Sequence, residues 1–476
     1  MKILILIFIP FLAIQFTLFA QAPNIEWTKT FGGIENAVGT VVIETSDNGY
    51  FVGGNKNLST YLVRLNHLGD SLWTKLSDYS SGDEDNVVPD LYELKIDDYM
   101  LGFRSSFGGL LRVKSQGDSI QYYPLILMGQ RRPPKFTHLC KTNDGNYILS
   151  IWGGWNDLGR LLMADSLGNE IWEKTFFNKP IRYVIQTHNG GFATIGIEGD
   201  FSASLGVSLQ KHNFDGEIIW SKIIYADTSF SNNYKDVRSE CLLQAADGGY
   251  YILCNGQDES AENYNIILFR TNEFGDTLWT RKYGGSGIDR GEYFTKTPDG
   301  GYLIVGSTES FGAGGSDVWL VKTDSLGNTE WTKTIGGTED DYGKYVQVTS
   351  DSGYIVTGGT HSYGQGDHDV WVIKLTHNPV SVDNTMKIVE QYELSQNFPN
   401  PLNPSTKIRY SLPQLSKVVI KVYDILGREI VTLVNEEKQT GTYDITWYAE
   451  NLPSGVYFYR IQAGDYVKTK KMVLLK

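Results

Sequence analysis

The fold of this chain is decided by residues 279–331, which read WTRKYGGSGIDRGEYFTKTPDGGYLIVGSTESFGAGGSDVWLVKTDSLGNTEW. The stretch holds four apolar runs of strand length, rich in Val, Ile, Tyr and Trp, and lacks the apolar spacing of a helix. Two turn signals, Asp299–Tyr302 and Leu326–Asn328, separate runs, because glycine supplies the positive φ that short hairpins need. The stretch therefore predicts a four-stranded antiparallel unit.

The same phrase recurs along the chain. A tryptophan strand marks each copy, at Trp27, Trp73, Trp172, Trp220, Trp279 and Trp331, with Gln121 in the remaining slot. The Asp-Gly-Gly type of turn recurs at Asp47, Asp97 (one residue shorter), Asp144, Asn189, Asp247, Asp299 and Asp351. Both series give seven copies, and the units span about 46 to 59 residues.

Four strands in each repeat favour a β-propeller among the repeat architectures. Tyr302–Gly306 and Val318–Lys322 are apolar on both faces, which predicts strands buried on both sides. Four-stranded units about 45 residues apart are what a propeller requires. The repeats resemble those of bacterial extracellular propellers, and a linear β-solenoid is the alternative. We therefore predict an all-β chain with a seven-bladed β-propeller over residues 21–376.

The phase of the repeat predicts how the ring closes. The chain enters the first repeat with a tryptophan strand, Ile25–Phe31, whereas no tryptophan strand follows the last apolar run, Val370–Leu375. If the tryptophan strand is the outermost strand of each blade, the N-terminal one must complete the seventh blade. The turn aspartates are expected to shape hairpins, and a metal-ligating role for them is the weaker alternative.

The C-terminal 85 residues, Tyr392–Lys476, differ in kind from the repeats. They contain NFPNPLNPSTKIRYSLP at 397–413, KVYDILGREI at 421–430, LPSGVYFYR at 452–460 and KTKKMVLLK at the end. Short β-rich runs alternate with turn signals about every ten residues, which predicts a small antiparallel, Ig-like β-sandwich. Residues 377–391, which include Pro379 and lack periodicity, are expected to be a linker.

This segment resembles the type A C-terminal sorting domain of cargo exported by the type IX secretion system of the Bacteroidetes. The resemblance implies recognition by that machinery and export across the outer membrane, often followed by removal of the domain and attachment to the cell surface. A secreted or surface-attached protein is therefore expected. The sorting-signal positions on which the resemblance rests are Asn400, Pro401, Gly427, Arg428, Gly455, Tyr457, Lys470 and Lys471.

The N-terminus agrees with export. Lys2 precedes the apolar run Ile3–Ile14, and the small residue Ala20 follows, which predicts a secretory signal peptide over residues 1–20. An uncleaved membrane anchor is the alternative, but the run is shorter than the roughly 20 residues needed to span a bilayer. No transmembrane segment is expected after the signal peptide is removed.

Charge narrows the classes of partner. The formal net charge of the chain is −13, while residues 392–476 carry 11 basic and 8 acidic side chains. Without Lys2 and the sorting domain, the ring and linker carry −17. A charge of this sign argues against nucleic acid, whose binding depends on neutralising phosphates. It is compatible with cations, basic partners or neutral sugars.

Three cysteines do not make a disulfide framework. Cys241 and Cys254 flank the Ala246–Gly249 turn symmetrically, and a two-residue hairpin would place them directly opposite one another. A disulfide and a pair of buried thiols are both open at this stage. Cys140 is expected to be free.

Any site is expected on one face of the ring. Consecutive strands run up and down, so the two tight turns of each blade share one face, and the long, variable connections share the other. The candidate binding face comprises Trp155, Asn156, Asp157, Asp289, Arg290, Asp340, Tyr342, His361, Tyr363 and His368. Exposed Trp and Tyr beside carboxylates and amides suit sugar rings. The alternative is that Trp155 and Tyr363 merely pack between neighbouring loops.

Signs of metal or catalytic chemistry are sparse. Acidic loop segments such as Asp83–Asp85 and Glu339–Asp341 leave calcium possible, but no Asp-x-Asp-x-Asp-Gly ladder is present, so we predict no cofactor. His361 and His368, with Asp367 and Asp369, make the most metal-like group, for which a polar loop tip is the alternative. No catalytic or metal-ligating residues are assigned.

The sequence therefore predicts a non-catalytic protein that binds glycans or proteins outside the cell. A secreted glycosidase or lyase acting on polysaccharide is one alternative, supported only by analogy with other propellers. A structural surface-layer component is the other.

Overall fold

The structure is a computed structural model of the chain. It describes residues 21–57, 59–77, 87–95, 98–104, 109–114, 119–124, 135–153, 158–177, 179–200, 203–224, 238–257, 263–376, 392–397, 400–402, 404–438, 441–449 and 452–475. The predicted signal peptide and linker lie outside this range. The chain divides between Pro379 and Val380 into two compact units. No helix long and apolar enough to cross a membrane occurs among the described residues.

In the first unit, the described strands form seven four-stranded antiparallel sheets, which we number as blades 1 to 7. Blade 1 contains β2 (Ala37–Glu44), β3 (Tyr50–Lys56), β4 (Ser59–Leu65) and β5 (Ser71–Leu76), and blade 2 contains β6 (Val87–Lys95), β7 (Asp98–Arg104), β8 (Gly109–Lys114) and β9 (Ser119–Pro124). Blade 3 contains β10 (Lys135–Lys141), β11 (Tyr147–Gly153), β12 (Leu158–Ala164) and β13 (Glu170–Phe176). Blade 4 contains β14 (Ile181–Gln186), β15 (Phe192–Asp200), β16 (Ala203–His212) and β17 (Ile218–Ile224).

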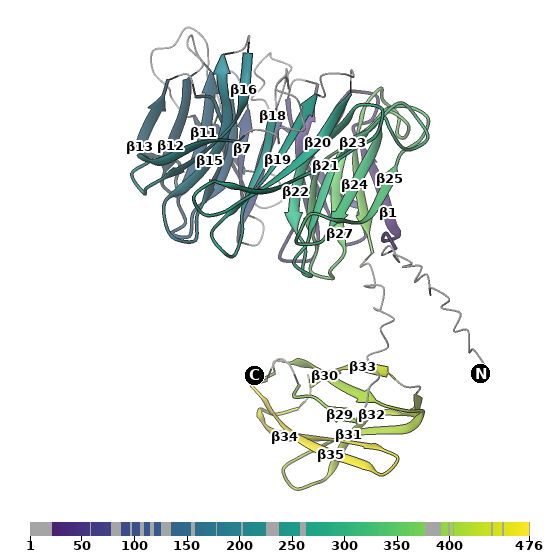
Figure 1. Cartoon of the computed structure of the whole chain (residues 1–476). Coiled ribbons are helices and arrows are strands. Elements are labelled where there is room, and N and C mark those ends of the chain that lie inside the picture. The colour runs from purple at the N-terminus through teal and green to yellow at the C-terminus, as the bar shows by residue number, and fades with distance from the viewer. Residues whose placement is uncertain are drawn as a thin grey trace, which may run out of the picture. The chain divides into compact units, whose positions relative to one another are not determined.

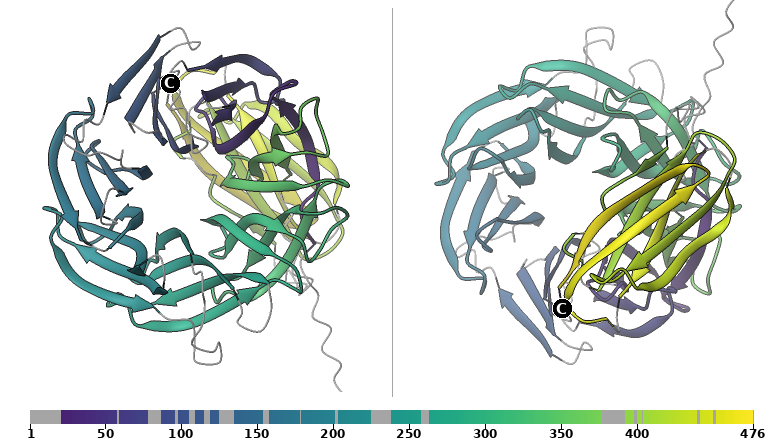
Figure 2. Two further views of the ribbon diagram at one scale, coloured as in Figure 1. Left: turned by 90° about the horizontal axis from the view of Figure 1, so that it is seen from above. Right: turned by 90° about the horizontal axis from the view of Figure 1, so that it is seen from below.

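Blade 5 contains β18 (Arg238–Gln244), β19 (Tyr250–Gln257), β20 (Tyr264–Thr271) and β21 (Thr277–Tyr283). Blade 6 contains β22 (Asp289–Lys296), β23 (Tyr302–Thr308), β24 (Asp317–Thr323) and β25 (Thr329–Ile335). Blade 7 contains β26 (Asp341–Val348), β27 (Tyr354–Thr360), β28 (Asp369–Leu375) and β1 (Ile25–Phe31). The ring appears from the side in Figure 1 and along its axis in Figure 2.

The blades close into a ring. The innermost strands contact one another in the order β2, β6, β10, β14, β18, β22 and β26, and β26 contacts β2 again. Within each blade the chain moves outward from the innermost strand, and radial repetition of this kind leaves only short edges. The seven-bladed β-propeller predicted from the repeats is therefore confirmed.

The N-terminal strand completes blade 7. Strand β1 pairs antiparallel with β28, placing Thr28 opposite Ile373 and Phe31 opposite Val370. The backbone N–H of Thr376 also donates to the carbonyl of Asn24 at 2.9 Å. The outermost strand of the last blade thus comes from the start of the chain, as the missing tryptophan strand predicts.

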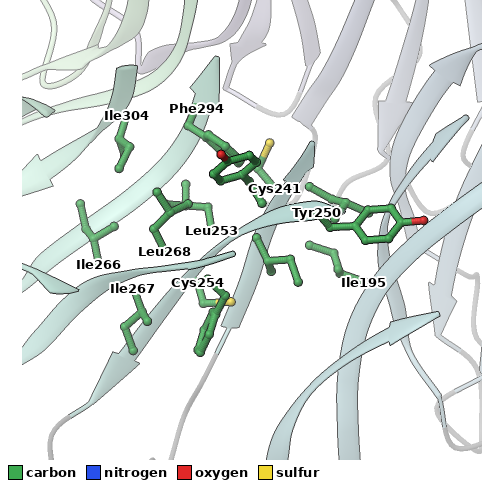
Figure 3. Packing of buried hydrophobic residues seen from close by; sticks show 14 of the residues in the cluster. Ile195, Cys241, Tyr250, Leu253, Cys254, Ile266, Ile267, Leu268, Phe294 and Ile304 are labelled. Carbon is green, nitrogen blue, oxygen red and sulfur yellow. The ribbon is translucent and has the colours of Figure 1, made fainter. Parts of the chain in front are cut away.

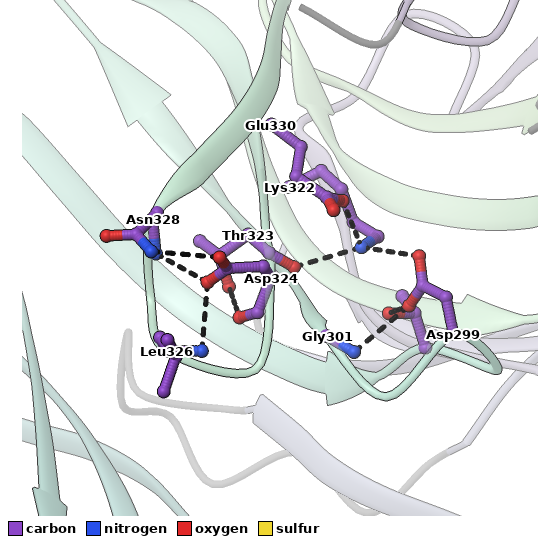
Figure 4. A network of polar contacts seen from close by, with 9 residues as sticks. Asp299, Gly301, Lys322, Thr323, Asp324, Leu326, Asn328 and Glu330 are labelled. Atoms are coloured by element: carbon purple, nitrogen blue, oxygen red, sulfur yellow. Dashed lines mark hydrogen bonds and ion pairs between the residues drawn. The ribbon is translucent and has the colours of Figure 1, made fainter. Parts of the chain in front are cut away.

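Lys322 links the Asp299 turn of blade 6 to the start of strand β25 (Figure 4). Its ammonium lies 2.8 Å from Oδ2 of Asp299 and 2.7 Å from Oε2 of Glu330. Burial acts to raise the pKa of Asp299, but the hydrogen bonds from Lys322 and Thr297 outweigh it and leave that pKa below its usual value. In the other turn, Asp324 accepts backbone N–H bonds through Oδ1. These aspartates therefore shape hairpins.

The arginine or lysine of the third strand repeats this pairing in other blades. Arg64 binds Asp47, Arg270 binds Asp247 and Lys374 binds Asp351. In blade 2 the predicted turn residue Asp97 lies outside the described residues, and the adjacent Asp98 binds Arg112. A basic side chain at this position therefore neutralises a turn carboxylate next to it.

At several junctions the repeated tryptophan packs against the next blade. The rings of Trp27, Trp220 and Trp331 lie 5.6, 6.1 and 6.4 Å from those of Tyr50, Tyr250 and Tyr354, respectively, the first residue of the second strand in the following blade. Trp279 lies over the turn glycine Gly327 of the next blade, where an added Cβ would come within 2.7 Å of the indole. The tryptophan, the turn glycine and the strand tyrosine are therefore one packing unit.

Every innermost strand carries a β-bulge, and this overturns the predicted relation of two cysteines. In β18 the register shifts between Ser239 and Cys241, so Cys241 pairs with Leu253 and Ser239 pairs with Cys254. The two thiols are free and buried, and they enter the core at separate points (Figure 3). The prediction that they lie directly opposite one another is wrong, because the bulge inserts Glu240.

The second unit is a small β-sandwich, as predicted. One sheet has the order β29 (Glu393–Leu394), β30 (Ser405–Leu412) and β33 (Gly441–Tyr448). The other has the order β32 (Glu429–Lys438), β31 (Ser416–Tyr423), β34 (Gly455–Ala463) and β35 (Tyr466–Leu474). Alternate residues of β31 and β34 are buried, and side chains such as Ile420, Tyr459 and Trp447 form a core of the unit's own.

Candidate binding site on the long-loop face

The ring has two unlike ends. The Asp-Gly-Gly and Leu-Gly turns lie at one end of each blade, the tight-turn face, because successive strands are antiparallel. The connections β21–β22, β23–β24, β25–β26 and β27–β28 lie at the other end, the long-loop face. The predicted residues Asp289, Arg290, Asp340, Tyr342, His361, Tyr363 and His368 lie there, whereas Trp155, Asn156 and Asp157 fall outside the described residues.

Two histidines and a tyrosine meet on blade 7. The rings of His361 and His368 have centroids 3.6 Å apart, and the hydroxyl of Tyr342 lies 3.1 Å from Nδ1 of His368. Backbone bonds hold both histidines: His361 N donates to the carbonyl of Asp340, and His368 accepts from Ala37 N of blade 1. We call Asp340, Tyr342, His361, Asp367 and His368 the blade 7 cluster.

The electrostatics of the cluster favour a neutral His368. Burial lowers the pKa of His368, the nearby His361 lowers it further, and Asp367 and Asp340 act against the shift. A neutral imidazole offers one donor and one acceptor nitrogen. Asp367 is exposed, with Oδ1 3.8 Å from Nδ1 of His361. The cluster therefore combines hydrogen-bond donors and acceptors at the surface of the ring.

Aromatic rings on blades 6 and 7 lie at equivalent positions on the same face of the ring as this cluster. Phe311 follows β23 and Tyr363 follows β27, three residues after the last residue of each strand, and they remain 48% and 45% exposed. Each rests on a buried tryptophan, Phe311 on Trp319 at 5.4 Å and Tyr363 on Trp371 at 5.2 Å between centroids. The Tyr363 hydroxyl also donates to the carbonyl of Gly336 at 3.1 Å. Both rings are therefore fixed from behind while one side stays in solvent.

Sequence reasoning named Tyr363 and missed Phe311. The repeated phrases Thr308–Phe311 and Thr360–Tyr363 carry the signal, since each ends in an aromatic residue after Thr-x-Ser. In both, the threonine side chain binds an aspartate at the start of the innermost strand. Comparing the two repeats position by position would have found the second ring.

Asp289 departs from the expected binding role because it is fully buried. Its carboxylate accepts from the backbone N–H of Gly285 at 2.7 Å, from the Ser310 hydroxyl at 2.6 Å and from the Thr308 hydroxyl. It therefore holds the β21–β22 and β23–β24 connections in place. The adjacent Arg290 is exposed, with its guanidinium 5.2 Å from the centre of the Tyr264 ring.

The group predicted to be most metal-like comes together only in part. His361, His368 and Asp367 are neighbours, but Asp369 is buried and accepts from the backbone N–H groups of Gln365 and Gly366 at 2.8 and 3.0 Å. Its carboxylate is thus engaged in the loop. Within the described ranges, no three His, Cys, Asp or Glu side chains are placed to hold a metal ion.

A second polar cluster, which sequence reasoning did not find, lies where the innermost strands converge. Each side chain in it follows the bulge of its strand: Asp90, His138, Tyr183, Cys241, Tyr293 and Tyr345. Oδ1 of Asp90 lies 3.1 Å from Nε2 of His138, whose ring stacks on Tyr183. Tyr293 and Tyr345 stack with centroids 4.1 Å apart.

This axial cluster is poorly suited to nucleophilic chemistry. Burial raises the pKa of Cys241 to about 12, so the thiol stays protonated at neutral pH. The Asp90 carboxylate also raises the pKa of Cys241, and it raises the pKa values of Tyr183, Tyr293 and Tyr345 in blades 4, 6 and 7. A thiol without its thiolate form is neither a good nucleophile nor a metal ligand.

In the sorting-like unit, the predicted signal residues belong to the four-stranded sheet or to the segment at Asn400 that bonds to it. Tyr457 is buried and its hydroxyl donates to the carbonyl of Pro453 at 2.8 Å. Gly427 and Arg428 lie in the β31–β32 hairpin, Gly455 begins β34, and Lys470 and Lys471 lie on β35, an edge strand of its sheet. Asn400 precedes Pro401, and its side-chain Oδ1 accepts from Val473 N at 2.9 Å. These residues therefore occupy turns, the interior strand β34 and the edge strand β35.

Comparison with known protein families matches residues 396–475 to the family described as secretion system C-terminal sorting domains. A search of curated proteins finds no match for the chain. Solved structures with a related fold include PorZ, described as an essential surface component of the type IX secretion system of Porphyromonas gingivalis, at 10% identity and a TM-score of 0.39 over 90% of this chain and 69% of PorZ.

Two other similar structures are a protein of unknown function from Bacteroides caccae and YCF48 from Cyanidioschyzon merolae. The first shares 11% identity at a TM-score of 0.39 over 63% of this chain and 94% of that one. The second shares 10% identity at a TM-score of 0.46 over 73% and 98%. These likenesses carry no argument about function. The C-terminal unit is a type IX secretion sorting domain, and it marks the propeller that precedes it as exported cargo.

Proposed function

We propose that the exported ring binds carbohydrate outside the cell without catalysing a reaction, and that the long-loop face of blades 6 and 7 makes the contact. The observation that carries the proposal is the pair of half-exposed rings, Phe311 and Tyr363, each backed by a buried tryptophan. Sugar rings present apolar faces edged with hydroxyl groups, and a fixed aromatic ring covers such a face at little cost in side-chain entropy.

The blade 7 cluster, on the same face of the ring as Tyr363, supplies the polar half of the recognition. The neutral His368 imidazole, the Tyr342 hydroxyl and the Asp340 carboxylate can each bond a sugar hydroxyl as donor or acceptor. Asp340 is already oriented, because its Oδ1 accepts from the backbone N–H of Ser316 at 2.9 Å. An aromatic platform with oriented acceptors beside it is therefore present before any ligand arrives.

The charge of the ring limits the kind of carbohydrate. With −17 assigned to ring and linker, neutral oligosaccharides suit this surface better than sulfated or phosphorylated ones. A basic protein surface is the other ligand class that the charge permits. Such a partner would depend on the carboxylates of Asp340 and Asp367, and its binding would weaken with salt, whereas stacking of a neutral sugar would not.

The test is a glycan-array screen of the full-length protein, with Phe311→Ala and Tyr363→Ala as variants and Phe274→Ala as the matched control. Phe274 is 59% exposed but lies in a turn on the tight-turn face. We expect binding to a neutral oligosaccharide that falls about tenfold in each long-loop variant and is unchanged in the control. Absence of binding by the wild type, or equal binding by all four proteins, would overturn the proposal.

A further inference from the structure

Three aliphatic side chains of the sorting domain are left in solvent at one end of a single hairpin. Ile425 and Leu426 are 72% and 74% exposed, and Ile430, four residues further on, is 37% exposed. By contrast, Ile420, an aliphatic residue of the preceding strand, is fully buried in the interior of the domain. We call these three residues the hairpin tip.

The turn between β31 and β32 does not need two apolar residues in order to form. Oδ1 of Asp424 accepts from the backbone N–H groups of Leu426 and Arg428, both at 2.9 Å. Oδ2 of Asp424 lies 2.6 Å from Nε of Arg428. Gly427 supplies a φ of 76°. Asp424, Gly427 and Arg428 therefore fix the backbone, and the two residues between Asp424 and Gly427 have no packing role in the turn.

The ring provides an internal comparison, because it uses the same turn. Asp324 accepts from Leu326 N and Asn328 N as Asp424 accepts from Leu426 N and Arg428 N. In that ring turn, Ser325 and Leu326 fill the two positions between the aspartate and the glycine. Each described ring turn of this kind has one apolar and one polar residue at these positions. The other pairs are His67 and Leu68, Ser166 and Leu167, Phe214 and Asp215, and Glu273 and Phe274. Among the described turns of this kind, both positions are apolar in the sorting domain and in none of the ring turns.

The surroundings of the turn glycine differ as well. In the ring, Gly327 is covered by the indole of Trp279, whereas a Cβ added at Gly427 would meet nothing within 4 Å. A bulge then turns Ile430 outward, since Tyr423 pairs with Glu429 and Val422 pairs with Val431. The turn and the bulge thus leave three aliphatic side chains uncovered around an open glycine.

We propose that the hairpin tip is a contact that the type IX export machinery reads, through an apolar pocket that takes Ile425 and Leu426. The partner is assigned on two grounds: the tip belongs to the segment that matches secretion sorting domains, and its local charge is balanced. Lys421 pairs with Glu429, and Arg428 pairs with Asp424. Recognition at this point rests on apolar contact rather than on charge.

The test is export of the full-length chain from cells with a type IX system, comparing wild type with the double variant Ile425→Ser and Leu426→Asp. Serine and aspartate already occupy these two positions in ring turns, at Ser325 and Asp215, so the hairpin is expected to fold. The control is Leu415→Ser with Val467→Asp, two exposed aliphatic residues at the other end of β31. Thermal unfolding of the purified proteins checks that all three are folded.

We expect the extracellular fraction of the hairpin-tip variant to fall about tenfold, while the control pair is exported like wild type. Normal export of a folded hairpin-tip variant would overturn the proposal, and so would equal retention of both pairs. A second copy of the chain is the competing occupant. If sedimentation shows that wild type self-associates through the tip while the variant is exported normally, the tip is a self-contact and the proposal fails.

Discussion

His212 is a buried histidine that titrates far from its usual range. It is one of seven histidines, and in the structure it is fully buried in blade 4. Its Nδ1 lies 3.1 Å from the carbonyl of Gly216 and its Nε2 lies 3.0 Å from the Thr194 hydroxyl. Because a carbonyl can only accept, Nδ1 carries the proton and Nε2 accepts from Thr194. Burial lowers the pKa of His212 to about 4, which keeps the imidazole neutral.

A pH dependence of stability follows from this residue. The folded pKa of about 4 lies below the unfolded value of 6.5, so the unfolded chain takes up the proton first as the pH falls. The neutral His212 therefore contributes its full share to the free energy of unfolding above pH 6.5. As the pH drops towards 4, about 3 kcal/mol of that free energy is lost.

Urea unfolding at several pH values, for wild type and His212→Leu, measures this term. Leu65 fills the equivalent position in blade 1 and is fully buried, which makes leucine a matched replacement. The variant is expected to be the less stable protein at pH 7, with the difference shrinking between pH 6.5 and 4. Parallel curves over that range would show that His212 does not titrate in this way.

At the scale of strands and turns, much of the blade could be predicted from sequence. Two-sided apolar runs such as Val318–Lys322 gave the buried strands, and the Asp-Gly-Gly phrase gave the hairpins. The bulges could not be predicted, because a register shift is a property of two paired strands and leaves no mark on the apolar pattern of one strand. For that reason the relation of Cys241 to Cys254 was predicted wrongly, and the axial contact of Asp90 with His138 was not foreseen.

The candidate site divides in the same way. Strand alternation alone placed Tyr363 and His368 on the long-loop side of the ring. It could not show that Asp289 is buried, since that depends on hydrogen bonds from Gly285 and Ser310 in two different loops. Turns can therefore be predicted from local sequence, whereas the burial of a loop side chain depends on contacts that form only in the assembled ring.

Alanine substitutions at two turn glycines of blade 6 distinguish the cost of backbone strain from the cost of disturbed packing between blades. Gly300 and Gly327 have φ values of 88° and 76°, so alanine is strained at either position. A Cβ at Gly300 meets nothing within 4 Å, while one at Gly327 meets the Trp279 ring at 2.7 Å. Gly300→Ala is expected to cost about 1–2 kcal/mol, and Gly327→Ala about 1–3 kcal/mol more.

Equilibrium denaturation of the two variants compares these costs directly. A third protein, Gly327→Ala combined with Trp279→Ala, tests the cause, because removal of the indole should bring the penalty of the added methyl close to that at Gly300. Equal destabilisation by the two single variants would mean that the tryptophan does not couple the blades through this turn.

At the scale of the whole molecule, the N-terminal strand closes the ring. Blade 7 carries Tyr363 and the blade 7 cluster, and β1 is its outermost strand. The connection from β1 to β2 also lies against the loop that carries His368: a Cβ at Gly366 would come within 2.9 Å of the Gly33 carbonyl, and Ala37 N donates to the carbonyl of His368. Closure thus shapes the blade 7 cluster as well as the ring.

Thermal unfolding of the chain lacking residues 21–33, compared with the complete exported chain, tests this claim most directly. Loss of β1 removes a whole strand from the pairing with β28 and uncovers the seam between the first and last repeats. We expect the unfolding midpoint to fall by at least about 10 °C, given the usual shift of a few degrees for each kcal/mol. An unchanged midpoint would contradict the account, because the ring would then be complete without its N-terminal strand.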